Sequence, residues 1–293
     1  MKILIIGASG LVGSNCLKYL SAQGHNCIGT YFSYPASGTV FYNTLQADNP
    51  DNFDVENFKP EIIIHCGALT HVDYCEQHED ESYRLTVQST QNILELARRH
   101  SAKIVFISTD YIFDGQNGPY DESAEANPIS IYGRHKWDAE QLISQSELEH
   151  LILRITNVYG DEERGKNFVA RIIDQAVKGQ HLTLKLPVDQ YATPVNAADI
   201  ARAIALLLKD EKTGVYNIAS TDYMNRVQLA LSVLKYFPEA TYDLYPMTTE
   251  QMAPPAARPL QGGLKTAKFL SAYPDFVFST VDDYVSRKRN DGQ

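Results

Sequence analysis

A tyrosine and a lysine four positions apart, Tyr132 and Lys136, are the side chains of this sequence best placed to transfer a proton. Four residues make about one helical turn, so both side chains would lie on one face of a helix. A phenol with an ordinary pKa of about 10 donates a proton poorly near neutral pH, and a cation one turn away would lower that pKa. The pair therefore predicts a proton donor beside a carbonyl group that receives hydride.

The same spacing also arises by chance, and a second pair stands at Tyr284 and Lys288 in a charged terminal segment. The plain alternative for either pair is a buried tyrosine and a surface lysine. The first pair differs because a strand-like run ends nearby in Ser108-Thr109-Asp110, where a loop would open over a cofactor. The Thr109 hydroxyl could share the hydrogen bonds of the substrate oxygen and stabilise charge that develops during transfer.

Three glycines, Gly7, Gly10 and Gly13, lie between the first apolar run and the first helical pattern. The first permits a tight turn, the second lets a pyrophosphate approach the backbone, and the third lets the helix pack closely on the sheet. The helix N-terminus would then face the phosphates. We expect a dinucleotide to contact this loop, including Ser9, Leu11 and Val12.

The choice between NAD and NADP is normally made at the end of the second strand, where NAD sites carry an acid and NADP sites prefer arginine. Here no Asp, Glu, Lys or Arg occurs between Tyr19 and Ala47. The hydroxyls of Thr30 and Ser33 could accept either ribose, and the lack of an acid removes repulsion of a 2′-phosphate. The sequence favours NADP, with NAD possible.

Short β-branched runs alternate with helical patterns in the first half of the chain, which predicts an α/β fold with a doubly wound parallel (Rossmann) sheet. The expected strands are residues 2–7, 26–31, 61–66, 103–108, 150–155 and 214–219, and the expected helices are 11–23, 76–100 and 196–209. We expect a dinucleotide-binding domain over 1–159 with a returning segment at 193–218. A smaller α/β substrate domain would comprise 160–192 and 219–293.

Composition narrows the function classes. Acidic residues outnumber basic ones by 36 to 26, giving a formal charge of −10, and no clustered basic face suggests a nucleic-acid partner. No apolar run is long enough for a membrane span or a signal-peptide core. Four scattered cysteines without a CxxC pair suit a reducing compartment, so we expect a cytoplasmic protein.

A metal site is the less favoured interpretation of one histidine-rich segment. His71, Cys75 and His78, with His65 upstream, have spacings that could suggest zinc, but ordinary loop packing is preferred and no metal is expected. Arg258, flanked by prolines, is the basic residue most readily assigned to a diphosphate, because its planar fork suits phosphate oxygens. A surface arginine is the alternative, and Asn167 is a weaker candidate for the same ligand.

Several motifs together resemble the extended short-chain dehydrogenase/reductases, and within them the dTDP-4-dehydrorhamnose reductase group. The resemblance runs from the glycine loop to about Lys268. Its motifs are His65-Cys66-Gly67-Ala68, Thr70 with Val72-Asp73, Ser108 to Gly115, Pro119 to Glu122, Tyr132 with Lys136, Asn167-Phe168-Val169, Asp189-Gln190 before Thr193-Pro194, and Arg258-Pro259.

The resemblance implies a reductase that uses NAD(P)H on a nucleotide-linked 4-keto-deoxysugar, as in dTDP-rhamnose biosynthesis. It implies that Thr109, Tyr132 and Lys136 are catalytic. Cys66, Gly67 and Ala68 would lie against the cofactor, together with Tyr132 and Lys136. The expected substrate contacts are Thr70, Asp110, Asn157, Asn167 and Arg258. The partner would be a small nucleotide sugar, and a homodimer is possible.

Two departures from the family pattern concern the substrate. Asn157 stands where these reductases tend to carry tryptophan, which is more like related sugar-nucleotide epimerases and dehydratases. After Arg258-Pro259 the family usually has a polar residue before a leucine, and here the segment is Gln261-Gly262-Gly263-Leu264. The chain also resembles the regulatory subunit of methionine adenosyltransferase, a reductase-like fold used as a binding partner. Epimerase or dehydratase activity and a non-catalytic regulatory role are therefore the alternatives, and the sugar and base stay open.

Overall fold

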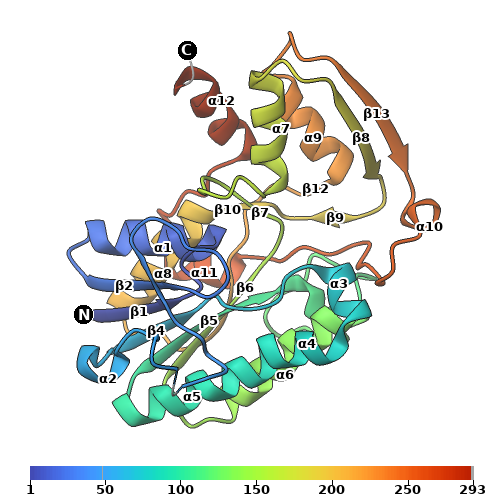
Figure 1. Ribbon diagram of the computed structural model, residues 1–293. Coiled ribbons are helices and arrows are strands. Elements are labelled where there is room, and N and C mark those ends of the chain that lie inside the picture. The colour runs from blue at the N-terminus through green and yellow to red at the C-terminus, as the bar shows by residue number, and fades with distance from the viewer. Residues whose placement is uncertain (48, 292–293) are drawn as a thin grey trace.

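A seven-stranded parallel sheet forms the centre of the computed structural model, which describes residues 1–47 and 49–291 (Figure 1). Its strand order is β11-β6-β5-β4-β1-β2-β3, so the winding direction reverses between β1 and β4. Ligands of such sheets bind beyond the carboxyl ends of the strands at that reversal. The predicted doubly wound parallel sheet is confirmed. The strands are β1 Lys2–Ile6, β2 Asn26–Tyr31, β3 Thr39–Phe41, β4 Ile62–His65, β5 Lys103–Thr109, β6 His150–Ile155 and β11 Gly214–Asn217.

Helices cover both faces of this sheet. Alternating side chains of β1 illustrate why, since Ile3 and Ile5 point into one core and Leu4 and Ile6 into the other. The first core packs against α1 (Leu11–Ala22), α8 (Ala197–Lys209) and α11 (Ala267–Ala272). The second packs against α2 (Val55–Phe58), α5 (Ser89–His100) and α6 (Ile131–Ser144). Burial on both faces explains the near-continuous apolar character of these strands.

A separate apolar core lies beyond the carboxyl edge of the sheet, in the upper part of Figure 1. It is built from α7 (Phe168–Val177), α9 (Arg226–Leu234), α12 (Val281–Asp291) and β8 (Leu182–Pro187). The small elements around it are β7 Val158–Tyr159, β9 Tyr191–Ala192, β10 Val195–Asn196, β12 Met224–Asn225, β13 Tyr242–Met247 and α10 Thr249–Met252. Strand β13 pairs with β8 in parallel, β10 with β7 in parallel, and β12 with β9 in antiparallel orientation.

The division into two domains stays a prediction, and one segment bears on it. Phe269 of α11, with Phe276 and Phe278, packs into the sheet core that α1 and α8 share, although 267–278 falls in the predicted substrate domain. The three aromatic rings contact one another, with centroids 4.7 to 5.9 Å apart, and so attach the chain to the sheet before α12 begins. The predicted range also includes residues 292 and 293, which lie outside the described residues.

The long helix predicted over 76–100 is wrong, because the structure divides this segment. Helix α3 (Val72–Gln77) ends at His78, whose ring stacks on Tyr74 with centroids 3.9 Å apart. Helix α4 (Glu79–Tyr83), the π-helix η1 (Arg84–Gln88) and α5 then follow. His78 has φ −136° and ψ 60°, outside the helical region, which interrupts the hydrogen-bond ladder that apolar periodicity alone would continue. Strand β3 was not predicted. No helix in the described ranges has the length and apolar character to cross a membrane.

Candidate functional site

The loops that follow β1, β2, β4, β5 and β6 all leave the same edge of the sheet, because the strands are parallel. The register sets Ile6 beside His65, and Thr109 beside Ile155. The residues that come directly after these positions therefore meet at one edge. This arrangement brings the glycine loop, the Cys66 loop, Thr109 and the Asn157 loop to a common site.

The glycine loop has the geometry that a dinucleotide pyrophosphate requires. Gly7 has φ +79°, a left-handed conformation that favours glycine. A Cβ on Gly13 would lie 2.5 Å from the Gly7 carbonyl oxygen, so only glycine allows α1 to pack this closely. A Cβ on Gly10 would meet only that same oxygen, at an ordinary 3.4 Å, which leaves space for a ligand. Helix α1 has no acidic residue in its first turn to oppose a phosphate.

The two ribose contacts predicted at the end of β2 differ in exposure, because Thr30 is buried and Ser33 is exposed. Thr30 is 1% exposed, and its hydroxyl donates to the Ile5 carbonyl (3.3 Å) and accepts from the Gly7 amide (3.4 Å). It thus holds the start of the glycine loop against β1, and its assignment to the ribose stays a prediction. Ser33 is exposed. A cavity of about 240 Å³ lies beside the loop, lined by Ala8, Ser9, Ser14, Leu17, Lys18, Ala36, Ser37 and Glu163.

The loop after β4 lies against the glycine loop. A Cβ on Gly7 would meet the Gly67 amide nitrogen at 3.1 Å, and Cys66 donates its amide to the Ile6 carbonyl. Cys66, Gly67 and Ala68 are half-buried. Burial raises the pKa of the Cys66 thiol to about 12, which leaves it protonated and unreactive. The three residues are placed to form a wall of the cofactor site.

Tyr132 lies in the first turn of α6, where Ser130 caps the helix by accepting a hydrogen bond from the Gly133 amide (3.2 Å). Its ring meets Tyr111 edge to face, with centroids 5.5 Å apart. Burial raises the pKa of Tyr132, and the Thr109 hydroxyl beside it acts in the opposite direction. This direction is opposite to the lowered pKa that the spacing to Lys136 predicted, because burial outweighs the other effects. Tyr132 is protonated near neutral pH, the form that a proton donor must have.

Lys136 lies on the same helix as Tyr132, as predicted, but is deeply buried. It is 4% exposed, its Nζ donates to the Ile107 carbonyl oxygen at 2.5 Å, and it lies 3.9 Å from the centre of the Phe106 ring. Burial lowers the pKa of Lys136 to about 7. The side chain is therefore held against β5 and titrates near neutral pH.

Helix α6 is anchored to the sheet by an ion pair between Glu140 and Arg154, whose side chains are almost wholly buried. Arg154 Nη2 lies 2.8 Å from Glu140 Oε2, and its Nε contacts both carboxylate oxygens at 3.2 Å. Arg154 also donates to the Glu122 carbonyl and packs over the Phe113 ring. The pair fixes the rotation and height of the helix that carries Tyr132 and Lys136.

Asp110 is buried and its carboxylate accepts hydrogen bonds within the protein, and its assignment to the substrate stays a prediction. It is 4% exposed and accepts hydrogen bonds from the Thr156 hydroxyl (2.7 Å) and the Gly263 amide (3.1 Å), with Thr109 further off at 3.4 Å. Burial raises the pKa of Asp110. The carboxylate joins the loops after β5 and β6 to the Gln261–Leu264 segment.

Asn157 and Arg258 each contact a charged residue. Asn157 has φ +38°, and its side-chain oxygen accepts from Arg226 Nη2 at 2.7 Å. Arg258 Nη2 forms an ion pair with Asp73 at 2.7 Å, and its Nη1 is buried without a hydrogen-bond partner in the described chain. Both Arg226 and Arg258 act electrostatically on Tyr111, which locates them in the same region.

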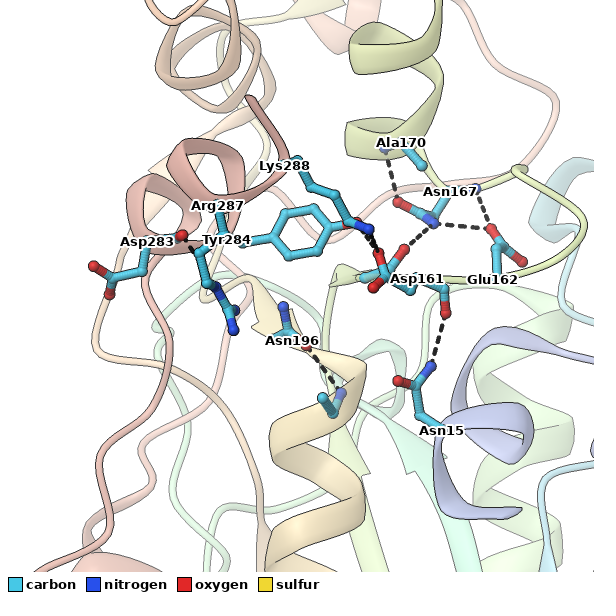
Figure 2. Close-up of polar contacts among 12 residues, drawn as sticks. Asn15, Asp161, Glu162, Asn167, Ala170, Asn196, Asp283, Tyr284, Arg287 and Lys288 are labelled. Atoms are coloured by element: carbon cyan, nitrogen blue, oxygen red, sulfur yellow. Dashed lines mark hydrogen bonds and ion pairs between the residues drawn. The ribbon is translucent and has the colours of Figure 1, made fainter. Parts of the chain in front are cut away.

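The other two predicted substrate contacts, Thr70 and Asn167, differ in their surroundings. Thr70 is exposed after β4. Asn167 caps α7 by accepting from the Ala170 amide (3.0 Å), and its Nδ2 donates to the Gly160 carbonyl and to Glu162 (Figure 2). Its side-chain polar atoms therefore form hydrogen bonds within the 160–167 loop and to α7, and its assignment to the diphosphate stays a prediction.

The second tyrosine and lysine pair lines a different cleft, of about 840 Å³, between α1, α7 and α12. Tyr284 donates to Asp161 Oδ1 at 2.8 Å, and Lys288 lies 2.8 Å from the same carboxylate (Figure 2). Asn15 of α1 donates to the Asp161 carbonyl (2.9 Å). Burial and Asp161 raise the pKa of Tyr284. This pair fastens α12 to Asp161, whose carbonyl in turn contacts α1.

The histidine-rich segment after β4 is occupied by local contacts. His71 caps α3 by accepting from the Tyr74 amide, and Cys75 is buried. Across residues 1–47 and 49–291, no group of three His, Cys, Asp or Glu side chains is arranged to hold a metal.

Arg226, Glu140 and Asp73 were missed from the sequence. Each acts on a predicted site residue, Arg226 on Asn157, Glu140 through the helix of Tyr132, and Asp73 on Arg258. Asp73 was noted only as part of a motif. The pairing of residues as distant as 73 and 258 depends on tertiary structure, and no local signal of the sequence indicates it.

Comparison with known proteins places these observations in a family. The family model described as RmlD substrate binding domain matches residues 1–278. Methionine adenosyltransferase 2 subunit beta of Bos taurus is 27% identical over 84% of this chain and 75% of its own length. dTDP-4-dehydrorhamnose reductase of Aggregatibacter actinomycetemcomitans is 29% identical over 79% of this chain and 78% of its own.

Solved structures agree with this placement. The dTDP-4-dehydrorhamnose reductase of Bacillus anthracis, determined in complex with NADP, superposes with a TM-score of 0.82 at 26% identity, covering 98% of this chain and 97% of that one. The match of the family model includes the glycine loop and ends at Phe278, before α12. The predicted resemblance is confirmed, and this chain belongs to the RmlD family of extended short-chain dehydrogenase/reductases.

Proposed function

We propose that this protein is an NAD(P)H-dependent reductase of a nucleotide-linked 4-keto-deoxysugar, similar to dTDP-4-dehydrorhamnose reductase. One observation carries the proposal: Thr109 at the end of β5 lies beside Tyr132, and Lys136 follows on the same helix at the same sheet edge as the glycine loop. The similarity to the reductases of B. anthracis and A. actinomycetemcomitans supports it.

The residues present fit a nicotinamide dinucleotide, with NADP favoured and NAD possible. Gly10 leaves room above the loop, α1 directs its N-terminus there, and Gly67 closes the side. Ser9, Leu11 and Val12 are half-buried in the loop and first turn, where a pyrophosphate would contact the backbone. The bound nicotinamide would supply the hydride. Lys18 and Glu163 both line the cavity beside the loop, so a 2′-phosphate there would meet one cation and one carboxylate.

The side chains divide the remaining chemistry. Tyr132 gives its proton to the oxygen of the reduced carbonyl, and Thr109 donates a hydrogen bond to the same oxygen. The phenolate left on Tyr132 is stabilised by the cationic form of Lys136 one helical turn away. Because its pKa lies near 7, Lys136 can also exchange a proton at neutral pH and so help to restore the phenol.

Turnover with a panel of nucleotide sugars tests the proposal. The purified protein is incubated with NADPH or NADH and dTDP-linked or UDP-linked 4-keto sugars, and cofactor oxidation is followed by absorbance. Oxidation that requires the keto sugar supports the reductase. The product is identified by mass spectrometry, which also separates reduction from epimerisation or dehydration of a nucleotide sugar.

A regulatory subunit is the second candidate, favoured by the similarity to methionine adenosyltransferase 2 subunit beta. A binding partner needs the fold but no proton donor, so the retained Thr109, Tyr132 and Lys136 favour the enzyme. Absence of oxidation with every nucleotide sugar, together with copurification of a stoichiometric protein partner, would favour the regulatory role. The expected cytoplasmic location and the possible homodimer stay predictions.

A further inference from the structure

We propose that Arg226 binds an anionic oxygen group of the substrate, either its diphosphate or a carboxylate on its sugar. The proposal rests on the proposed function only in taking the ligand to be a nucleotide sugar. Arg226 is the first residue of α9, in the region beyond the carboxyl edge of the sheet, and it approaches the loop that follows β6.

The two groups that contact the Arg226 guanidinium directly are uncharged. Its Nη2 donates to the side-chain oxygen of Asn157 at 2.7 Å, and its guanidinium carbon lies 5.2 Å from the centre of the Phe168 ring. An amide and an aromatic ring orient a guanidinium without neutralising it. The side chain is half-buried, and burial lowers its pKa. A guanidinium in that setting has donors left for an oxyanion.

The nearby carboxylates are engaged elsewhere. Asp110 and Arg258 both act electrostatically on Arg226, so the three groups share a region with Tyr111. The Asp110 carboxylate accepts from Thr156 and from the Gly263 amide. The carboxylate of Asp73, the other acid near Tyr111, holds Arg258. No ion pair within the described ranges includes Arg226, so no carboxylate of the described chain contacts its guanidinium directly and a substrate oxyanion could take that place.

The backbone at Asn157 is strained in a way that serves this arrangement. Its φ of +38° lies in the left-handed region, which asparagine enters more readily than most residues but still at a cost. That conformation is kept where the amide oxygen meets Arg226. Asn157 thus holds the guanidinium two residues beyond the level at which Ile155 of β6 pairs with Thr109.

Arg258 supplies a second unused donor in the same region. Its Nη1 is buried and has no hydrogen-bond partner in the described chain, and a buried unsatisfied donor costs free energy unless a ligand completes it. Two guanidiniums near one tyrosine match the planar, bidentate recognition of phosphate or carboxylate oxygens. In a nucleotide sugar such oxygens belong to the diphosphate or to a carboxylate on the sugar, and binding experiments distinguish the two.

Calorimetric titration of the ligand-free protein tests the proposal without turnover. The probes are UDP, dTDP, UDP-glucose and UDP-glucuronic acid, of which the last two differ in the sugar carboxylate. The variants are Arg226→Gln, which removes the charge, and Arg226→Lys, which keeps it. Arg171→Gln, an exposed arginine on neighbouring α7, is the matched control.

Loss of a charge-assisted hydrogen bond corresponds to about a 10–100-fold weaker Kd. If Arg226 binds the diphosphate, Arg226→Gln should raise the Kd for UDP or dTDP by that factor. If Arg226 binds a sugar carboxylate, the variant should raise the Kd for UDP-glucuronic acid and leave the Kd for UDP-glucose unchanged. Arg226→Lys should lose less than Arg226→Gln, and Arg171→Gln should match the wild type. Wild-type and Arg226→Gln affinities within about twofold for all four probes would overturn the proposal, as would a wild type that binds none of them.

Thermal unfolding separates binding from a merely structural role. An arginine that holds the fold together would lower the Tm when replaced, whereas an incompletely neutralised binding arginine should leave the Tm unchanged or raise it. We expect Arg226→Gln to unfold at or above the wild-type Tm and yet to lose anion affinity. A reductase that fails for another reason, such as an inactive Tyr132, leaves these binding results unaffected, so the two failures are distinguishable.

Discussion

The Nζ of Lys136 donates a hydrogen bond to the carbonyl oxygen of Ile107, 2.5 Å away in the middle of the sheet. The lysine is thereby held beneath the site instead of projecting into solvent, with the Phe106 ring against its ammonium group. Because water is excluded, the cationic form loses hydration that one carbonyl and one ring do not fully replace. This explains why the pKa of Lys136 falls to about 7.

The buried lysine makes stability depend on pH. Its pKa is about 7 when folded and ordinary when unfolded, so between those values the unfolded chain binds more protons. The free energy of unfolding therefore rises with pH in that window. The stability gained in this way is lost again as the pH falls toward 7. Relative to Lys136→Met, we expect the wild type to gain about 1–2 kcal/mol between pH 7 and 9, measured by urea unfolding. An identical pH slope in both proteins would contradict the burial.

The ion pair between Glu140 and Arg154 should be a large contributor to the position of α6. Glu140→Gln leaves the Arg154 guanidinium buried without its countercharge, which should lower the free energy of unfolding by about 3–5 kcal/mol. Glu79→Gln is the control, because Glu79 meets Arg134 at 3.9 Å on the surface. Chemical denaturation of both variants checks this, and equal small effects would mean that the pair is not desolvated.

The glycine loop predicts opposite outcomes at two of its positions. Gly10→Val places its side chain where only the Gly7 oxygen is near, so the fold should survive while NADPH binding weakens. Gly13→Val would push α1 away from the Ala8 backbone and should reduce the Tm by several degrees. Calorimetry with NADPH and a thermal melt distinguish them. Unchanged cofactor affinity in Gly10→Val would remove the loop from the cofactor site.

Local patterns predicted the sheet well, because they follow from burial. Five of the six expected strands begin at the observed residue, since β-branched runs buried on both faces admit few alternatives. Thr109 was reached through the same regularity, because it ends a strand, whereas Gly67 was assigned through the family resemblance. Tyr132 and Lys136 were found from spacing and from their position along the chain.

What the sequence did not indicate depends on tertiary structure. Thr30, Asp110 and Asn167 have suitable polar groups, but each is engaged with the backbone or a neighbouring loop. Arg226 was not identified because its role depends on Asn157, 69 positions earlier. The break at His78 arises from stacking on Tyr74, which apolar periodicity does not report.

The steady-state rate of NADPH oxidation with a dTDP-linked 4-keto sugar, compared between the wild type, Tyr132→Phe and Tyr284→Phe, tests the central claim most directly. Tyr132→Phe removes the proton donor and keeps the ring, so kcat should fall by about 10²–10⁴-fold with cofactor affinity little changed. Tyr284→Phe removes only the bond to Asp161 and should turn over like the wild type. Equal losses at both tyrosines, or an undiminished rate in Tyr132→Phe, would contradict the account.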